Sequence, residues 1–598
     1  MIKHTYSEVW ELDSIFPGGS ESTHFQSHLE ESSKTVEAFQ QKINEWIPQN
    51  ENVKTVLLNL IEEFQNSAKK IRQAGAFVSC LQAQNTNDLK ANDLRSKVAK
   101  LSASLQTALT LFDERLTKIE EEKWISLVQD AEIRELSFVL NERRNAAQEK
   151  LSSKEESLIN ALGVDGYHGW GQLYDLIVAS IKIPLEVEGK MEHLSVGQAF
   201  NKFSSSDPEL RKKVFVEWEK AWADKADYLA KTLNHLAGFR LNVYELRGWE
   251  NVLKEPLDLN RMEQKTLDTM WQVITNMKQP LVKYLQRKAH LLGLEKLSWA
   301  DLDAPLGKTE SKVSYQEGAE FIMKQFEVFG EEMAEFAKLA FENKWIEAED
   351  RTGKAAGGFH TYFPESSQSR IFMTFSGTPS NVSTLAHELG HGFHTYAMRD
   401  LHQLNRNYAM NVAETASTFA EMIVADASLK EAKSKEEKIA LLDDKLQRSV
   451  ALLMNIHARF LFETRFYEKR KEGPVSKEIL NDLMLSAQKE AYSHSLSEYH
   501  QLFWASKLHF FITGVPFYNF PYTFGFLFSL GIYAKAIEEG TGYEQKYIAL
   551  LKDTASMTVE ELALKHLDVD LTTPEFWGKA MELCMQDVEE FLTLTKED

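Results

Sequence analysis

Apolar residues recur at helical spacing over long stretches of this chain. Between Ala76 and Leu162 there is neither glycine nor proline. Within that stretch, apolar residues follow one another in steps of four and three: Leu94, Val98, Leu101, Leu105, Leu109 and Phe112. Such steps place apolar side chains on one face of an α-helix. The pattern therefore predicts long helices that each bury one stripe, and it indicates a core face rather than a functional site.

The pattern changes between residues 163 and 210. Four glycines there mark a predicted connection: Gly163, Gly166, Gly169 and Gly171. The segment IKIPLEVEGKMEHLSV alternates enough to predict a small hairpin around Glu188 and Gly189. The segment SSSDPELRKKVF predicts a helix start with Pro208 at its first position. We therefore predict an N-terminal helical domain over residues 1–199 and a second domain over residues 200–598.

Residues 200–350 again show helical spacing, whereas residues 351–380 do not. Glycines open and close this second stretch around two short β-type runs, TYF and RIFMTF. A glycine loop and a strand directly before the next helix predict a small β element. Either it forms one wall of a substrate site, or it is a plain surface loop and edge strand.

Composition limits the partners and the compartment. The helical spacing predicts a mostly α protein. With 598 residues the chain is longer than one hydrophobic core usually accommodates, so we expect two or three subdomains. The formal net charge of -21 argues against nucleic acid and membrane as partners. Two distant cysteines, no signal-like apolar start and no long apolar run predict a cytoplasmic protein. The sequence does not indicate the oligomeric state.

The segment TLAHELGHGFHTYA carries the candidate chemistry. His387 and His391 are four residues apart, so on a helix their imidazoles share one face and could bind one Zn²⁺. Glu388 flanks that face and could act as a general base without binding the metal. The alternative is a buried helix whose two histidines are satisfied by the core.

Residues around this motif refine the prediction. Ser380, Asn381 and Ser383 are candidate caps for its helix. Glycine inside a helix costs about 1 kcal/mol relative to alanine. Gly390 and Gly392 therefore predict close approach of another element.

A catalytic zinc site needs a third protein ligand. The metzincin pattern is excluded because Ala397 stands where its third histidine would be. His394 lies too far along the helix axis and is expected to pack or to support a ligand. In NVAETASTFAEMIVADASL, Glu414 and Glu421 are seven residues apart, which places them on one helix face. We expect Glu414 to bind the metal and Glu421 to orient a ligating histidine; the alternative is two ordinary solvated glutamates.

An aromatic segment, HFFITGVPFYNFPYTFG, contains His509, Tyr518 and Tyr522. Neutral donors such as phenol and imidazole stabilise the oxyanion that forms when a peptide bond is hydrolysed. The alternative is an aromatic core cluster.

These segments resemble the oligoendopeptidase F group of the thimet-oligopeptidase-like (M3) family of zinc peptidases. The likeness runs through nearly the whole chain, in EVWELDSIFPG, GVDGYHGWGQLYDL, DPELRKKVFVEWEKAW, GTPSNVSTLAHELGHGFHTY and AETASTFAE. In the family a glutamate that opens a Glu-x-x-Ser element is the third ligand, which here is Glu414 followed by Ser417. Many members have proline where this chain has Ala416.

The resemblance also implies roles for the aromatic segment and a shape. The family's transition-state donors, one histidine and two tyrosines, match His509, Tyr518 and Tyr522, although the interval after the histidine is longer here than in the thimet branch. The implied fold is a multi-helical, zincin-type molecule with a deep substrate channel between two lobes. Such a channel admits short unfolded peptides.

We therefore predict a metalloendopeptidase that holds one Zn²⁺ per chain in residues 200–598 and cleaves short peptides with Glu388 as general base. The strand RIFMTF is expected to hold the peptide by strand addition. Three alternatives stay open: a metallocarboxypeptidase, an inactive peptide-binding scaffold, and a structural helical protein.

Overall fold

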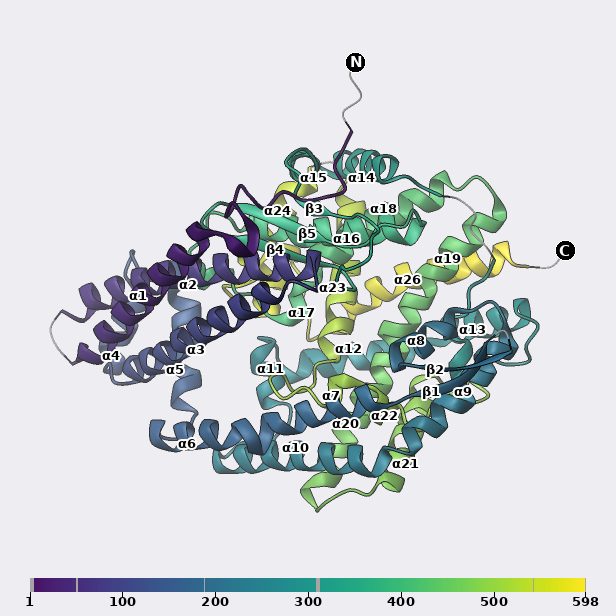
Figure 1. The fold of residues 1–598 in the computed structure, drawn as a ribbon, viewed down its shortest axis with the longest axis horizontal. Helices are drawn as coiled ribbons and strands as arrows, with labels where there is room; N and C mark the ends of the chain where they lie inside the picture. Colours follow the sequence, from purple (N-terminus) through teal and green to yellow (C-terminus); the bar gives the residue numbers. More distant parts are fainter. Residues whose placement is uncertain (1–4, 50–51, 188, 308–311, 541, 597–598) are drawn as a thin grey trace.

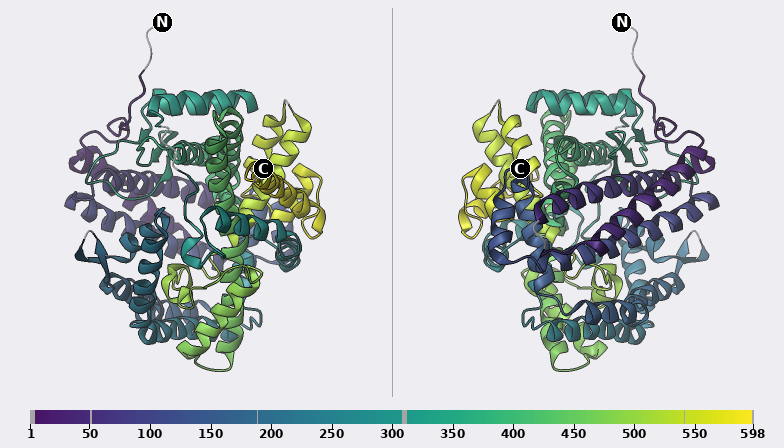
Figure 2. Two further views of the ribbon diagram at one scale, coloured as in Figure 1. Left: turned by 90° about the vertical axis from the view of Figure 1, so that its right-hand side faces the viewer. Right: turned by 90° about the vertical axis from the view of Figure 1, so that its left-hand side faces the viewer.

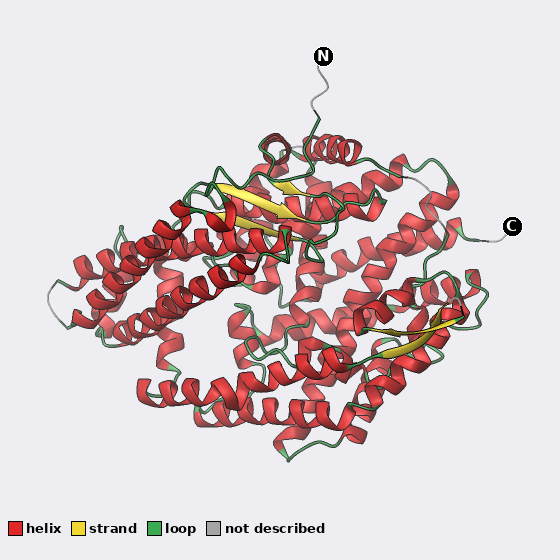
Figure 3. Cartoon of the chain, in the orientation of Figure 1, coloured by secondary structure: helices red, strands yellow, loops and turns green. Residues whose placement is uncertain are grey.

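Helices form most of the molecule, as the apolar spacing predicts. The structure is a computed structural model that describes residues 5–49, 52–187, 189–307, 312–540 and 542–596. Figures 1 and 3 show long helices with strands in two small sheets. Among the described residues, no helix has the length and apolar content needed to cross a bilayer. The mostly α fold class is confirmed.

Long helices make up the N-terminal part. They are α1 (Thr23–Glu45), α2 (Val53–Gln84), α3 (Leu89–Thr117), α4 (Glu121–Gln129) and α5 (Ser137–Gln148). Figure 2 shows α1, α2 and α3 side by side on one flank. Most of the stripe predicted on α3 is buried, from Leu94 to Phe112. One buried cluster of these helices also includes Phe363 and Phe372, so this part packs on the central sheet.

The glycine cluster after residue 162 does not form a connection, which corrects the sequence prediction. It lies in one continuous helical rod made of α6 (Ser153–Gly163), a π-helical turn (Val164–His168) and α7 (Gly169–Ser180). A Cβ on Gly163 would lie 3.6 Å from the Phe239 ring, and one on Gly171 would lie 3.2 Å from the carbonyl oxygen of Phe511. The glycines therefore permit close packing instead of breaking the helix.

The hairpin and the helix start that follow are confirmed. Strand β1 (Ile183–Val187) pairs antiparallel with β2 (Lys190–Leu194); Glu188, in the predicted turn, lies outside the described residues. Helix α9 begins at Pro208, and the Asp207 side chain caps it by accepting the N–H groups of Glu209 and Leu210.

Helices continue to residue 342. They are α8 (Val196–Asn201), α9 (Pro208–Ala223), α10 (Ala226–Leu246), α11 (Lys254–Leu259), α12 (Gln264–Met277), α13 (Gln279–Leu291), α14 (Tyr315–Phe329) and α15 (Glu331–Glu342). One large core extends from Tyr174 to Phe591. The domain boundary near residue 200 and the channel between two lobes stay predictions.

A three-stranded sheet precedes the motif helix, as the β-type runs predict. Its strands are β3 (Ile346–Glu347), β4 (Phe359–Phe363) and β5 (Gln368–Phe372), in the order β3-β5-β4. Strand β5 pairs parallel with β3 and antiparallel with β4. The predicted addition of a peptide to RIFMTF is therefore wrong for Arg370–Phe372, which lie in the central strand between β3 and β4. Beyond the strand, Met373 and Phe375 donate to the carbonyl oxygens of Glu347 and Ala348 on the β3 side, and strand addition to Met373–Phe375 stays a prediction. The free edge belongs to β4.

The remaining helices follow the sheet along the chain. They are α16 (Pro379–Ala397), α17 (Met410–Ala413), α18 (Thr415–Glu431), α19 (Lys435–Val450), a π-helical turn (Ala451–Asn455), α20 (Ile456–Lys471), α21 (Lys477–Ala491), α22 (Phe503–Ser506), α23 (Phe520–Glu539), α24 (Tyr543–Asp553), α25 (Val559–Leu567) and α26 (Pro574–Leu594). In Figure 1, α16 lies beside the three-stranded sheet, and α18 packs against α16.

Candidate metal centre and active site

Helix α16 carries the two motif histidines and begins at a capping box. The Thr378 side chain accepts the N–H of Asn381, and the Asn381 side chain accepts the N–H of Thr378. The cap is therefore Thr378 and not one of the three predicted residues; of these, Asn381 closes the box at the third helical position. Pro379 fits the first position because a helix needs no N–H donor there.

Close contact between α16 and its neighbours explains the two glycines, as predicted. A Cβ on Gly390 would lie 2.4 Å from the carbonyl oxygen of Ala416 and 2.6 Å from the Cα of Ser417. A Cβ on Gly392 would lie 2.6 Å from the Phe336 ring. Because Gly390 lacks a side chain, α18 approaches α16 closely enough for Glu414 to reach the motif histidines.

His387, His391 and Glu414 converge. Their nearest ligand atoms all lie within 4.8 Å of one another. Oε2 of Glu414 is 3.4 Å from Nε2 of His387 and 3.5 Å from Nε2 of His391. Ligands bonded at about 2.1 Å to a tetrahedral zinc are about 3.4 Å apart, so the two distances from Glu414 fit that ion. Glu414 lies at the junction of α17 and α18 and not within a helix as the spacing suggested.

Further polar groups hold the three donors in place. The Ser417 hydroxyl donates to Oε2 of Glu414 over 2.7 Å. The His391 ring forms a hydrogen bond with the backbone of Ala413. Burial lowers the pKa of His391 to about 4, although Glu414 opposes the shift, so the imidazole is neutral at physiological pH. A neutral imidazole has a free lone pair, which metal binding requires.

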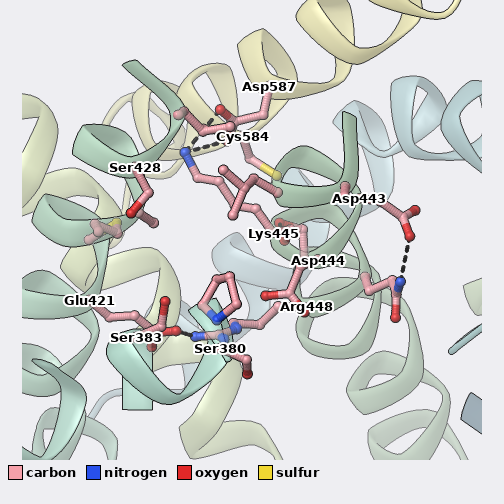
Figure 4. Close-up of a pocket in the computed structure, with 18 of the residues that line it drawn as sticks. Ser380, Ser383, Glu421, Ser428, Asp443, Asp444, Lys445, Arg448, Cys584 and Asp587 are labelled. Carbon is pink, nitrogen blue, oxygen red and sulfur yellow. Dashed lines mark hydrogen bonds and ion pairs between the residues drawn. The ribbon is translucent and has the colours of Figure 1, made fainter. Parts of the chain in front are cut away.

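Glu421 supports His387 from the opposite side of the ring. Its Oε2 lies 3.3 Å from Nδ1 of His387, which leaves Nε2 facing Glu414. Glu421 also forms an ion pair with Arg448 of α19. Figure 4 shows both residues at the edge of a cavity of about 230 Å³. Sequence reasoning missed Arg448 because it stands in a charged helix whose pattern indicates only a solvated face.

Glu388 is buried beside the three donors. Only 6% of the residue is exposed, and its Oε2 has no hydrogen-bond partner among the described residues. Burial raises its pKa to about 7; the Glu414 charge adds to the shift and His387 opposes it. A Cβ on Gly358, directly before β4, would lie 2.9 Å from Oε1 of Glu388. The edge strand therefore starts at this carboxyl group, whose pKa suits proton transfer near neutral pH.

His394 is not among the converging donors. Its Nε2 lies 2.9 Å from the Thr554 hydroxyl, and its ring stacks on Tyr408 at 4.2 Å. Burial lowers the pKa of His394 to about 3. It is a buried packing residue of α16.

The structure brings His509, Tyr518 and Tyr522 together. The His509 ring lies 5.5 Å from the Tyr518 ring and 6.3 Å from the Tyr522 ring, and the two tyrosine rings are 5.8 Å apart. Burial lowers the pKa of His509 to about 4, so the ring is neutral. Burial, a hydrogen bond with Tyr518 and the nearby Glu414 charge raise the pKa of Tyr522.

Helix α23 links this aromatic group to the metal donors. A Cβ on Gly525, three residues after Tyr522, would lie 3.3 Å from the Cβ of Glu414. The Ser529 hydroxyl, one turn further on, donates to the carbonyl oxygen of Glu414 over 3.3 Å. One side of α23 is therefore fixed against the Glu414 backbone. The arrangement brings together three residues that could hold a metal ion, a buried carboxyl group and an aromatic group.

Comparisons with known proteins show which proteins this chain resembles. The sequence model described as peptidase family M3 matches residues 203–583, and the one described as oligopeptidase F matches residues 115–183. An oligoendopeptidase F homologue of Lactococcus lactis is 26% identical over 540 residues, covering 88% of each chain. A solved structure from Chlamydophila abortus has a TM-score of 0.85 at 20% identity over 99% of both chains. The structure of oligoendopeptidase F from Enterococcus faecium has a TM-score of 0.71 at 18% identity, covering 96% of this chain and 98% of that one.

Proposed function

The chain belongs to peptidase family M3 and is a metallo-oligopeptidase that cleaves internal peptide bonds, and from this premise we propose its metal, its residue roles and its substrates. It is a zinc-dependent oligoendopeptidase in which His387, His391 and Glu414 bind one Zn²⁺ per chain. The observation that carries the proposal is the convergence of these three donors next to the buried Glu388.

The metal would supply a Lewis acid that lowers the pKa of water from 15.7 to about 7. Glu388 removes a proton from the attacking water and returns it to the leaving amine. Its pKa of about 7 supports both transfers, because such a group binds and releases a proton at neutral pH. Glu421, held by Arg448, fixes the orientation of the His387 ring.

Tyr522, Tyr518 and His509 donate hydrogen bonds to the oxyanion of the tetrahedral intermediate. Burial keeps His509 and Tyr522 neutral at physiological pH, so they stabilise the developing charge without binding a free anion tightly. Substrates are short unstructured peptides in extended form. They add to the free edge of β4, which begins beside Glu388.

Two variants and a metal assay test these roles. Elemental analysis should find one zinc per chain, and chelation should abolish hydrolysis of a peptide library followed by mass spectrometry. Glu388→Gln should retain zinc while kcat falls by about 10² or more. Glu414→Ala should lose zinc affinity. Peptides blocked at both ends should still be cut, which separates this enzyme from a carboxypeptidase. If both variants bind zinc normally, Glu414 is not a ligand.

A further inference from the structure

Lys507 is a half-buried cation that lacks a carboxylate partner. Its Nζ lies 5.2 Å from the ring centroids of both Phe200 and Phe503. No carboxylate oxygen of the described residues lies within the 4.0 Å limit of an ion pair with it. Burial and the nearby Arg459 lower the pKa of Lys507 to about 7, although the charge of Asp303 opposes the shift. Since acidic residues outnumber basic ones in this chain, 89 to 68, the missing partner needs an explanation.

Arg459 is a second cation that has no carboxylate partner among the described residues. Its Nε donates to Oδ1 of Asn455 over 2.8 Å, and its Nη1 donates to Oδ1 of Asn519 over 3.0 Å. Its guanidinium carbon lies 5.3 Å from the Phe503 ring centroid, so Phe503 contacts both cations. Within the described residues, Arg459 has no ion-pair partner and its Nη2 donates no hydrogen bond.

Both cations line one cavity of about 200 Å³ with aromatic walls. The space exceeds the roughly 10–15 Å³ that one water molecule requires. Among the described residues that line it, Asp303 is the one carboxylate, and it lies beyond ion-pair distance of Lys507. Two cations therefore face one carboxylate, and the cavity favours an added anion.

The cavity adjoins the proposed active site on two sides. Lys507 precedes His509 by two residues, and Asn519, bound to Arg459, directly follows Tyr518. The positive charges of both cations add to the effect of burial in lowering the pKa of His509. On the other side, Gln447 lines the cavity. The next residue, Arg448, forms the ion pair with Glu421.

We propose that this cavity binds a carboxylate of the bound peptide, which accepts hydrogen bonds from Nζ of Lys507 and Nη2 of Arg459. The proposal rests on the proposed function, because the ligand is the peptide substrate. Its C-terminal carboxylate and an acidic side chain offer the same chemistry. The aromatic walls contact the apolar part of the same residue. A carboxylate held here fixes which peptide bond reaches Glu388, and so selects the length or the sequence of the substrate.

Two pairs of peptides separate the possible sources. The first pair differs only in a C-terminal carboxylate or amide. The second pair has an amidated end and differs in an internal Glu or Gln. Values of kcat/KM are measured with the wild type, with Lys507→Met and with a control, Lys477→Met. The control removes a partly exposed lysine of α21 that is paired with Asp227 of α10. Binding constants are measured in the Glu388→Gln background, so the preference is tested even if no peptide is cut.

The wild type should prefer the carboxylate member of one pair by about 10- to 100-fold, since a hydrogen bond to a charged group has that value. Lys507→Met should reduce this preference to a few-fold, and Lys477→Met should retain it. Methionine keeps the contacts with both phenylalanine rings, and a thermal melt checks the fold. A preference confined to the second pair assigns the cavity to an acidic side chain. The proposal is wrong if the wild type shows no preference in either pair, or if Lys507→Met keeps the preference. Failure of hydrolysis alone contradicts the proposed function instead.

Discussion

Gly390→Ala tests whether contact between α16 and α18 sets the geometry of the metal donors. The new Cβ would lie 2.4 Å from the carbonyl oxygen of Ala416 and 2.6 Å from the Cα of Ser417. Both atoms are backbone, so no side-chain rotation relieves the overlap. Nonbonded contacts to carbon are ordinarily about 3.5 Å, and the two helices must therefore separate by roughly 1 Å.

The separation should change both stability and metal affinity. Alanine gains about 1 kcal/mol over glycine in a helix, whereas overpacking costs about 1–3 kcal/mol. A backbone overlap belongs at the upper end of that range, so we expect a net destabilisation of about 1–2 kcal/mol.

Glu414 is two residues before Ala416, and metal–ligand distances tolerate only about 0.2 Å. Loss of a supporting group costs about 10- to 100-fold in affinity, and displacement of a ligand should cost at least as much.

Competitive zinc titration against a chromophoric chelator, together with denaturant melts, provides the measurement. A matched control is Gly578→Ala on α26, where a Cβ would meet no atom within 4 Å. That variant should become slightly more stable and bind zinc normally. Wild-type zinc affinity in Gly390→Ala would refute the argument that this glycine holds Glu414 within reach of His391.

Three further variants extend these tests. Arg448→Met should leave Glu421 unsupported and weaken zinc binding by about 10-fold or more in the same titration; unchanged affinity would show that Arg448 has no orienting role. Tyr522→Phe should lower kcat by about 10²–10³ while KM and the melting temperature stay unchanged. A core role predicts a lower melting temperature and an unchanged kcat. Burial raises the pKa of Glu463 from its ordinary 4.5 to about 8. Between these pH values the native chain keeps a proton that the unfolded chain releases, so the free energy of unfolding falls as pH rises. Glu463→Gln should therefore stabilise the protein more at pH 8 than at pH 5 in urea melts, and an equal effect at both would contradict the protonated state.

Local patterns predict those features whose cause is local. The stripe on α3 follows from side-chain periodicity alone, and the hairpin follows from alternation around a glycine turn. The motif histidines share a face because four residues make about one helical turn. Position within a sheet is not a local property. RIFMTF has the composition of any strand, and only the pairing of β5 with β3 and β4 shows that its first half, Arg370–Phe372, lies in the centre of the sheet.

Groups that support the site are harder to predict because their partners are distant in sequence. Arg448 meets Glu421 through the packing of α19 on α18, and no feature near Arg448 indicates that contact. Lys507 stands near Phe503 and His509 in sequence, but Phe200, whose ring lies 5.2 Å from its Nζ, is brought to it by the fold.

Glycine shows how the same residue supports a correct prediction and a wrong one. Gly390 correctly indicated close approach, because a zinc motif on a helix requires the helix to continue through it. Gly163 and Gly171 were interpreted as a break, because no motif required continuity there. In the structure all three glycines have the same physical role, because each lacks a Cβ and so allows close packing. Gly390 of α16 allows contact with Ala416, whereas Gly163 of α6 and Gly171 of α7 allow contact with Phe239 and Phe511. The second contact joins α7 to the segment that continues to Tyr518. Glycines in both helical segments therefore help to position the proposed site: Gly390 acts on Glu414 through α18, and Gly171 acts on the aromatic segment through Phe511.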